Sequence, residues 1–281
     1  MDSQVDKAIR LRQLHRGPRA LVLPNVWDVA GARIIEEAGY SAIATTSAGI
    51  AFSLGYPDGE HIAPGEMIAR IARIARAVNL PVTADVEAGY GPRPEDAART
   101  TREVIQAGAV GMNLEDASGD PEHPLLELQT AVEKIKASRE AAAQLRVPVV
   151  VNARTDVYLL PGEPDTQDAE ALRRLIAFRD AGADCVFAPG LKAAATIARL
   201  VKALQCPLNI LAVVGAPAIP ELERLGVARV SLGSGPARAT LTLLRCMAEE
   251  LKTTGTYGAL EGAIPHAEVN RMLNGHTTAD R

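Results

Sequence analysis

Four times in this sequence, a helix-like segment ends at a glycine that is followed directly by an apolar run. Glycine just past a helix commonly adopts the left-handed conformation that ends the helix. Three further apolar runs are entered through proline, which loses no ladder hydrogen bond at the first residue of a strand. With Leu21-Val22-Leu23-Pro24, these runs predict eight strands. The glycine junctions are Ala38-Gly39-Tyr40-Ser41, Ala107-Gly108-Ala109-Val110, Ala181-Gly182-Ala183-Asp184 and Leu225-Gly226-Val227-Ala228, and the proline entries are Leu80-Pro81-Val82, Val147-Pro148-Val149 and Cys206-Pro207-Leu208.

Amphipathic helical patterns separate these strands. In residues 67–76, Arg70, Arg73 and Arg76 share one face and the isoleucines occupy the other. Strands that are apolar on both faces and alternate with helices predict a parallel sheet covered by helices. Eight such units favour an α/β fold of the (β/α)8 TIM-barrel type, and an open doubly wound sheet is the alternative. Further helices are predicted from Pro94 and over residues 125–145, 166–181, 192–204, 218–225 and 236–251.

Two segments lie outside the eight units. A helix is predicted at residues 3–15, and a tail at 253–281 contains a short helix near 267–273. We expect this C-terminal part to cross onto a neighbouring subunit. No linker or low-complexity segment is visible, so residues 1–281 are interpreted as one domain with its barrel core at about 20–252.

The composition favours a globular enzyme over a nucleic-acid-binding protein. Hydrophobic residues make up 47% of the chain and aromatic residues only 3%, which offers little surface for base stacking, and the net charge of −4 argues against a polyanionic partner. Neither a signal pattern nor a membrane-length apolar run is visible, so we expect a cytoplasmic protein. Cys185, Cys206 and Cys246 are far apart and are interpreted as small apolar residues in a reducing compartment.

Acidic residues follow two of the predicted strands. Asp85 and Glu87 come after one apolar run, Glu115 after the next, and Asp58 lies in an earlier loop. On an extended strand Asp85 and Glu87 point to the same side. Carboxylates gathered at strand ends repel one another and are costly to desolvate without a cation. The pattern favours a Mg²⁺ or Mn²⁺ site over solvated loop acids or helix caps.

Other polar groups follow the remaining strands. They are Ser47-Ala48-Gly49 after the second strand, Asn152, Arg154 and Asp156 after the fifth, and Asn209 after the seventh. Arg154 fits either a structural salt bridge or bidentate recognition of a carboxylate or phosphate. Backbone N–H groups and the Ser47 hydroxyl could cradle an oxyanion opposite it, which favours recognition. The sequence contains no GxSxG, P-loop or dinucleotide-binding glycine pattern.

At these residues the sequence resembles the isocitrate lyase/phosphoenolpyruvate mutase superfamily over about residues 21–239. The resemblance implies a β/α barrel whose last helix is swapped between subunits, usually in a tetramer, and that binds Mg²⁺ and a 2-oxo acid or its enolate. It also implies that Asp85 contacts the metal while Asp58, Glu87 and Glu115 hold its waters. Ser47, Ala48 and Gly49 would then hold the substrate carboxylate, with Arg154 on a carboxylate or oxo group and Asn209 nearby. The motifs are Asn25-Val26-Trp27-Asp28, Ser47-Ala48-Gly49, Ala84-Asp85-Val86-Glu87-Ala88-Gly89-Tyr90-Gly91, Leu114-Glu115-Asp116, Ala153-Arg154-Thr155-Asp156, Asp58 and Asn209.

The sequence departs from this superfamily where protons are transferred. Lyases of the superfamily carry an acid/base cysteine in the loop after Leu-Glu-Asp, and the mutases and phosphonopyruvate hydrolases use lysine and asparagine there. Here residues 117–124 read Ala-Ser-Gly-Asp-Pro-Glu-His-Pro. Phe187-Ala188-Pro189-Gly190 stands where the lyases often have glutamate, and Thr45 where an aromatic residue is frequent. Asp120, Glu122 and His123 are the remaining candidates for a proton donor.

The resulting hypothesis is a Mg²⁺-dependent lyase for a small 2-oxo or 2-hydroxy di- or tricarboxylic acid, such as oxaloacetate or a (methyl)isocitrate-like substrate. C–C cleavage or decarboxylation would pass through a metal-bound, pyruvate-like enolate, with Arg154, Glu115 and Asp58 as catalytic candidates. Decarboxylation needs only an electron sink at the bond-breaking step, which makes the missing cysteine tolerable. The alternatives are P–C bond chemistry on a phosphonopyruvate-type substrate and a non-catalytic 2-oxo-acid-binding protein.

Overall fold

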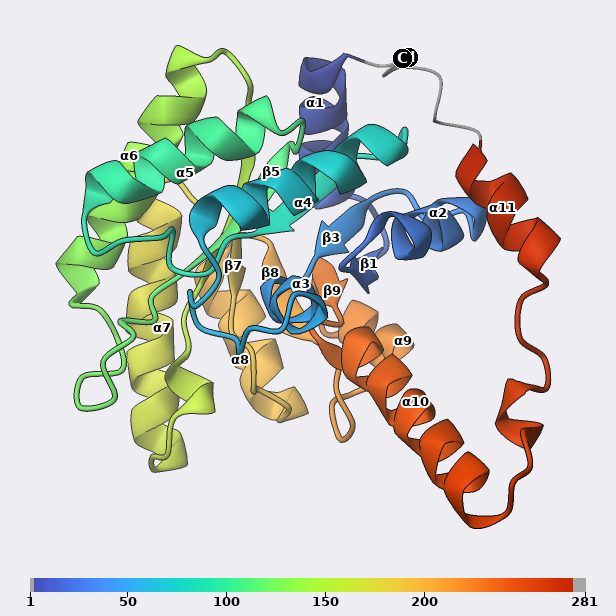
Figure 1. Ribbon diagram of the computed structural model, residues 1–281. Coiled ribbons are helices and arrows are strands. Elements are labelled where there is room, and N and C mark those ends of the chain that lie inside the picture. Colours follow the sequence, from blue (N-terminus) through green and yellow to red (C-terminus); the bar gives the residue numbers. More distant parts are fainter. Residues whose placement is uncertain (1–2, 275–281) are drawn as a thin grey trace.

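The protein forms a closed barrel of parallel strands, described for residues 3–274 by a computed structural model (Figure 1). The first predicted strand is β1, and Pro24 separates it from a further short strand, β2, that was not predicted. Since β1 pairs with β9 and β2 pairs with β3, these two strands join the edges of the sheet and close it. The TIM barrel is therefore confirmed over the open sheet. The strands are β1 (Leu21–Leu23), β2 (Asn25–Val26), β3 (Ile43–Thr45), β4 (Val82–Asp85), β5 (Gly111–Glu115), β6 (Val150–Arg154), β7 (Cys185–Phe187), β8 (Leu208–Leu211) and β9 (Arg229–Ser231).

Helices surround the barrel, and most of the predicted segments are helical within a few residues. One helix was not predicted: Ser47-Ala48-Gly49 forms the first turn of α3, capped by the Thr46 hydroxyl, which accepts from the Gly49 N–H. The helices are α1 (Gln4–Leu14), α2 (Val29–Glu37), α3 (Ser47–Ser53), α4 (Pro64–Ala77), α5 (Pro94–Gln106), α6 (Leu128–Gln144), α7 (Pro164–Asp180), α8 (Ala194–Leu204), α9 (Ile219–Arg224), α10 (Gly235–Thr253) and α11 (His266–Asn274), with short 3-10 turns η1 (Val157–Leu159) and η2 (Gly258–Leu260).

The four helix-to-strand glycines have the left-handed backbone that the sequence predicts. Gly39, Gly108, Gly182 and Gly226 have φ angles of 82°, 94°, 102° and 85°. Each follows a helix directly, so a residue with a Cβ atom would be strained there. These turns feed the chain into β3, β5, β7 and β9 and therefore set the spacing of half of the barrel.

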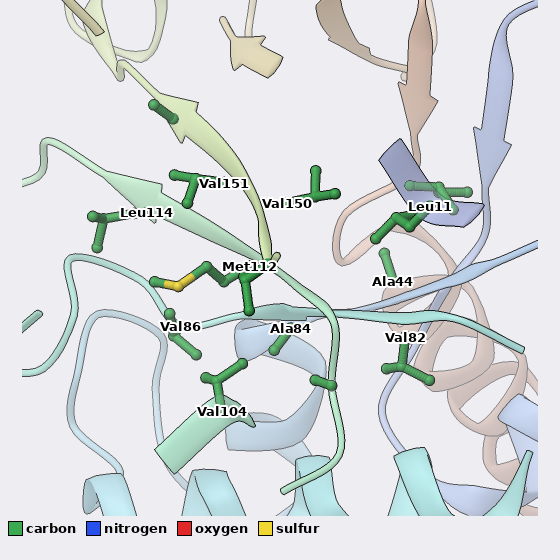
Figure 2. Packing of buried hydrophobic residues seen from close by; sticks show 14 of the residues in the cluster. Leu11, Ala44, Val82, Ala84, Val86, Val104, Met112, Leu114, Val150 and Val151 are labelled. Carbon is green, nitrogen blue, oxygen red and sulfur yellow. The ribbon is translucent and has the colours of Figure 1, made fainter. Parts of the chain in front are cut away.

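The main core lies between the barrel wall and the surrounding helices. Figure 2 shows Met112 of β5 pointing toward Val86 and toward Val104 of α5, all fully buried. Val150 and Val151 of the neighbouring β6 are also inaccessible to solvent. The apolar side chains thus hold the helices on the barrel, while the carboxyl ends of the strands are left for polar groups.

The N-terminal helix α1 closes the opposite end of the barrel. Gln4 donates to the Ala109 carbonyl at 3.1 Å, and Arg12 pairs with Asp184 at 2.9 Å, both just before barrel strands. A Cβ atom at Gly111 would lie 2.8 Å from Leu11 and 2.8 Å from the Thr83 hydroxyl. The helix can therefore seat against β5 only because residue 111 is glycine.

The C-terminal arm extends away from the barrel. Ala237 is the only buried residue of α10, and the arm returns so that α11 lies beside α2, where Arg33 donates to the Met272 carbonyl at 3.1 Å (Figure 1). Residues 275–281 of the predicted tail lie outside the described part of the chain. Between residues 3 and 274, no helix is both long and apolar enough to cross a membrane.

His15, at the end of α1, makes the stability of the fold depend on pH. It is 5% exposed, and its Nδ1 lies 2.8 Å from the Leu11 carbonyl. Burial, with a smaller contribution from the Arg229 charge, lowers the pKa of His15 from 6.5 to about 4. The folded state therefore resists a proton that the unfolded chain accepts. The stability that this neutral ring confers is complete above pH 6.5 and is lost as the pH falls towards about 4.

Replacing this histidine tests the effect. In His15→Leu, the fall in the free energy of unfolding between pH 6.5 and pH 4 should be smaller than in the wild type by at most about 3 kcal/mol. Urea denaturation across this range, with each protein referenced to its own value at pH 8, measures the difference. Parallel curves for the two proteins would contradict the assignment.

Candidate active site

Polar side chains from several strand ends line a cavity of about 200 Å³ at the open end of the barrel. Asp85 ends β4 and Arg154 ends β6, while Ser47 and Ala48 come from the first turn of α3. Parallel strands bring their carboxyl ends to the same side of a barrel, so residues far apart in the sequence meet there. The other lining residues are Asn25, Thr46, Asp58, Asn113, Leu159, Phe187, Pro189, Leu211, Ser231, Gly233 and Ser234.

The Asp85 carboxylate is held by several donors. One oxygen accepts from the Ser47 N–H at 3.0 Å and from the Ser47 hydroxyl at 2.8 Å, and the other accepts from the Asn113 amide at 3.3 Å. The Asp85 N–H donates to the Thr45 hydroxyl at 2.9 Å. Because the donors to this carboxylate lie on α3 and β5, its orientation is set by a helix and a strand rather than by a loop. It is 8% exposed and lines the cavity.

Glu87 lies beyond the end of the strand that carries Asp85. The strand ends at Asp85, and Glu87 has a left-handed backbone with φ of 51°, so the two-residue alternation of a strand no longer applies. Its carboxylate accepts from the Glu60 N–H, and the Tyr90 hydroxyl lies 3.5 Å away. Glu87 lines a second, adjoining pocket of about 170 Å³, together with Glu115 and Lys134.

Arg154 makes ion pairs on two sides. Its Nη1 lies 2.6 Å from Glu115, and its Nε and Nη2 donate to the two oxygens of Asp156 at 2.5 and 2.9 Å. Desolvation lowers the pKa of Arg154, but the charges of Glu115 and Asp156 outweigh it and raise the pKa above its usual value. The guanidinium carbon also lies 5.9 Å from the centre of the Phe187 ring. A guanidinium has five N–H donors, so these contacts leave donors for a ligand in the cavity.

The acidic residues are crowded enough to raise one another's pKa values. Burial, followed by the charge of Asp58, raises the pKa of Glu87 to about 7. The pKa of Asp58 is raised by desolvation and by Asp85, although the residue sits in an exposed loop. Burial raises the pKa of Glu115 well above its usual value, although the charge of Arg154 opposes this shift. A cation at this end of the barrel would relieve this repulsion.

The carboxylates fit a hydrated cation better than a closed protein cage. Within residues 3–274, no group of three or more His, Cys, Asp or Glu side chains is arranged to hold a metal ion by itself. Mg²⁺ usually keeps several waters and takes only one or two carboxylates directly. The donor set therefore suits one direct ligand, with the neighbouring acids reaching the ion through water, and Asp85 is the carboxylate that lines the cavity beside Asp58.

Two expected substrate contacts lie elsewhere. The Gly49 N–H is used in capping α3, and a Cβ atom at this position would lie 3.1 Å from Trp27 and 3.3 Å from Ala237, so the glycine allows close packing there. Asn209 is fully buried and exchanges hydrogen bonds of 3.1 and 3.3 Å with Ser231. Neither residue lines the cavity.

The loop at residues 117–124 is exposed at its tip. The ring of His123 lies 3.4 Å from the Asp120 carboxylate, and its side chain is 81% exposed. Ser118 and Gly119 line the second pocket beside Glu87. The structure therefore places the base of this loop next to the acidic residues and leaves the three candidate proton donors, Asp120, Glu122 and His123, facing solvent.

Several residues at the site were missed by the sequence reasoning. Asn113 contacts Asp85, Glu60 holds Glu87 through its N–H, and the buried ammonium of Lys134 donates to the carbonyls of Ala88 and Gly91 at 2.6 and 2.8 Å. The sequence could have identified Asn113, because it lies two residues before Glu115 on the same strand. Lys134 carries no such signal, because it occupies an ordinary position in a helical segment.

Asp116 holds the two residues that follow Arg154 in the sequence. This fully buried carboxylate accepts from the Thr155 hydroxyl at 2.7 Å, the Asp156 N–H at 2.9 Å and Arg174 at 3.1 Å. Burial raises its pKa to about 6, against the opposing effect of these donors. Through Thr155 and Asp156, the carboxylate fixes the turn that follows β6.

Neutralising Asp116 should therefore destabilise the fold. In Asp116→Asn the buried Arg174 loses a charged partner, and we expect the free energy of unfolding to fall by about 2–4 kcal/mol. Guanidinium denaturation measures the change. Arg173→Ala removes an exposed partner of Glu170 and serves as the control, with an expected change below about 1 kcal/mol. Equal, small effects would show that the Asp116 contacts carry little stability.

Comparisons with known proteins agree with this architecture. The family model described as phosphoenolpyruvate phosphomutase matches residues 11–252. The 2-methylisocitrate lyase of Bacillus subtilis is 32% identical over 73% of this chain and 67% of its own length. A crystal structure from Burkholderia cenocepacia, described only in general terms as a lyase/mutase, is 39% identical, covers 95% of both chains and has a TM-score of 0.89.

Ligands are present in a further solved structure. Oxaloacetate acetylhydrolase, 27% identical over 97% of this chain and 96% of its own with a TM-score of 0.85, was determined with its product oxalate. These matches agree with the closed barrel. The chain therefore belongs to the phosphoenolpyruvate mutase/isocitrate lyase superfamily.

Proposed function

We propose that this protein is a Mg²⁺-dependent lyase that breaks a C–C bond, by cleavage or decarboxylation, in a small 2-oxo or 2-hydroxy carboxylic acid. The observation that carries the proposal is the combination of Asp85 and Arg154 on one small cavity, with Asp58 also lining it. An acidic pair and a guanidinium that line the same small cavity suit a ligand that is bound by both a cation and a guanidinium.

The cation would supply the electron sink. Bound Mg²⁺ acts as a Lewis acid that polarises an oxo group and stabilises the negative charge formed as the bond breaks. Asp85, fixed by Ser47 and Asn113, is the residue that would hold it, and Asp58, Glu87 and Glu115 would hold its waters. A cation there would also lower the pKa values of the three surrounding acids, which burial raises, because a nearby positive charge favours their ionised forms.

The remaining residues would orient the substrate. Arg154 is held in place by Glu115 and Asp156, so its unused N–H donors have a fixed direction for a substrate carboxylate. Ala48 and Ser47 also line the cavity, at the beginning of α3. A cavity of about 200 Å³ suits a compact acid such as oxaloacetate. The oxalate bound by oxaloacetate acetylhydrolase and the name of the Bacillus subtilis lyase support a substrate with adjacent oxygen functions.

Decarboxylation fits this chain especially well because the bond-breaking step requires no general acid. The loop residues Asp120, Glu122 and His123 face solvent, and the Lys134 ammonium is committed to the carbonyls of Ala88 and Gly91. These hydrogen bonds of Lys134 also argue against a phosphonate substrate, because such a substrate would be expected to need a free positive charge near the loop.

Turnover of oxaloacetate tests the proposal. Purified protein with Mg²⁺ should release pyruvate faster than Mg²⁺ alone, EDTA should abolish the excess, and Asp85→Ala should reduce it by about 10²-fold or more. Asp180→Ala, at an exposed aspartate beside Arg179, is the matched control and should retain full activity. Turnover that survives Asp85→Ala would exclude the mechanism, and binding of oxalate without turnover of any acid in a substrate panel would identify a binding protein.

We also propose that a second copy of the chain covers α10. Leu241, Leu243, Leu244 and Leu251 are each 51–59% exposed on this helix, and burial of such side chains favours association. The double variant Leu241→Glu/Leu244→Glu should sediment as a smaller species than the wild type, which we expect to be a tetramer. Lys252→Glu on the same helix should not alter the assembly. A wild-type monomer would contradict the proposal.

A further inference from the structure

Arg229 is a fully buried cation inside the barrel. It lies on β9, is 0% exposed, and donates from Nη2 to the side-chain oxygen of Asn113 at 3.2 Å. Its Nε and Nη1 have no hydrogen-bond partner among residues 3–274. Burial of a guanidinium with so few partners is costly, and apolar residues of similar size often replace such groups without loss of stability. The fold alone therefore gives no reason for an arginine at this position.

The contact with Asn113 links Arg229 to the cavity. The Asn113 oxygen accepts both from Arg229 and from the Asn152 amide at 2.6 Å. An amide turned by 180° would direct its NH₂ group at these two donors, so the observed orientation is the one that they permit. In this orientation the Asn113 NH₂ donates to Asp85 at 3.3 Å. Arg229 and Asp85 thus contact opposite ends of one amide.

The charges around Arg229 also connect this residue with Asp85. Several acids lie at the open end of the barrel, and Arg154 is engaged there by Glu115 and Asp156. Burial lowers the pKa of Arg229, and the negative charges of Cys185 and Asp85 act against this shift and favour its cationic form. His15 faces Arg229 from α1, and burial keeps that ring neutral at ordinary pH. Asp85 is thus a carboxylate whose charge acts on Arg229.

We propose that Arg229 is a positioning residue that acts through Asn113 to fix the orientation of the Asp85 carboxylate. It touches neither the cavity nor any ligand in it. The effect on the geometry of Asp85 follows from the contacts alone, whereas the effect on cation binding rests on the proposed function. The two parts can therefore be tested separately.

The first test is structural. A crystal structure of Arg229→Met without metal should show the Asn113 amide rotated or withdrawn, with its contact to Asp85 lengthened beyond hydrogen-bonding distance. An unchanged Asn113–Asp85 contact would overturn the proposal. If Arg229→Met does not fold, the same comparison is made with Arg229→Lys, which keeps the charge and one donor group; it should retain the contact, and a lost contact despite that donor would overturn the proposal.

The second test measures Mn²⁺ binding to the metal-free protein by electron paramagnetic resonance. Arg229→Met should weaken binding about 10- to 100-fold, the usual effect of removing a group that orients a metal ligand, and Arg229→Lys should restore part of the loss. Arg139→Met, at a partly exposed arginine paired with Asp184, is the control and should bind Mn²⁺ like the wild type. Unfolding midpoints identify a variant that is merely unstable.

The outcomes separate the two proposals. Wild-type protein that binds no Mn²⁺, or that binds it as well after Asp85→Ala, would refute the proposed function, and the crystallographic comparison would still decide the role of Arg229. Wild-type affinity in a folded Arg229→Met variant, in a protein whose binding depends on Asp85, would overturn the role of Arg229 alone.

Discussion

Mutual repulsion among carboxylates is the constraint around which the open end of this barrel is organised. Asp58, Asp85, Glu87 and Glu115 come from three separate segments, and each of the raised pKa values among them reflects burial together with the charge of a neighbouring acid. Such an arrangement is unfavourable unless something offsets it. Arg154 offsets part of this charge through its ion pair with Glu115, Arg229 interacts with the charge of Asp85, and the proposed cation would offset the remainder.

The hydrogen bonds at the site keep these groups in place at some cost to stability. Asp85 is held by Ser47 and Asn113, Arg154 by Asp156 and Glu115, and the turn after β6 by Asp116. Buried ionic groups are often no more stabilising than apolar residues of the same size. Their value here lies in fixing the directions of a few oxygens and N–H groups, as orientation of reacting groups requires.

The barrel was predictable from the sequence because its signals are local and repeated. Gly39, Gly108, Gly182 and Gly226 each mark a helix end by a conformation that other residues adopt with difficulty. The polar residues at the strand ends were predictable as a group for a second reason, because parallel strands present their carboxyl ends on the same side of a barrel. The left-handed backbone of Glu87 was not predictable, because this residue is not a glycine. Lys134 and Arg229 were also missed, because a single charge within a helix or a strand does not reveal what it faces across the fold.

The seating of α1 also bears on how the chain is made. This helix precedes the barrel strands in the chain, yet several of its contacts are with residues more than 100 positions further along, namely Ala109, Pro148 and Asp184. During translation it must remain without its docking surface until well over half of the barrel has left the ribosome, and such distant contacts slow folding. An early-emerging amphipathic segment of this kind is a natural target for chaperones, and its late docking would complete the barrel.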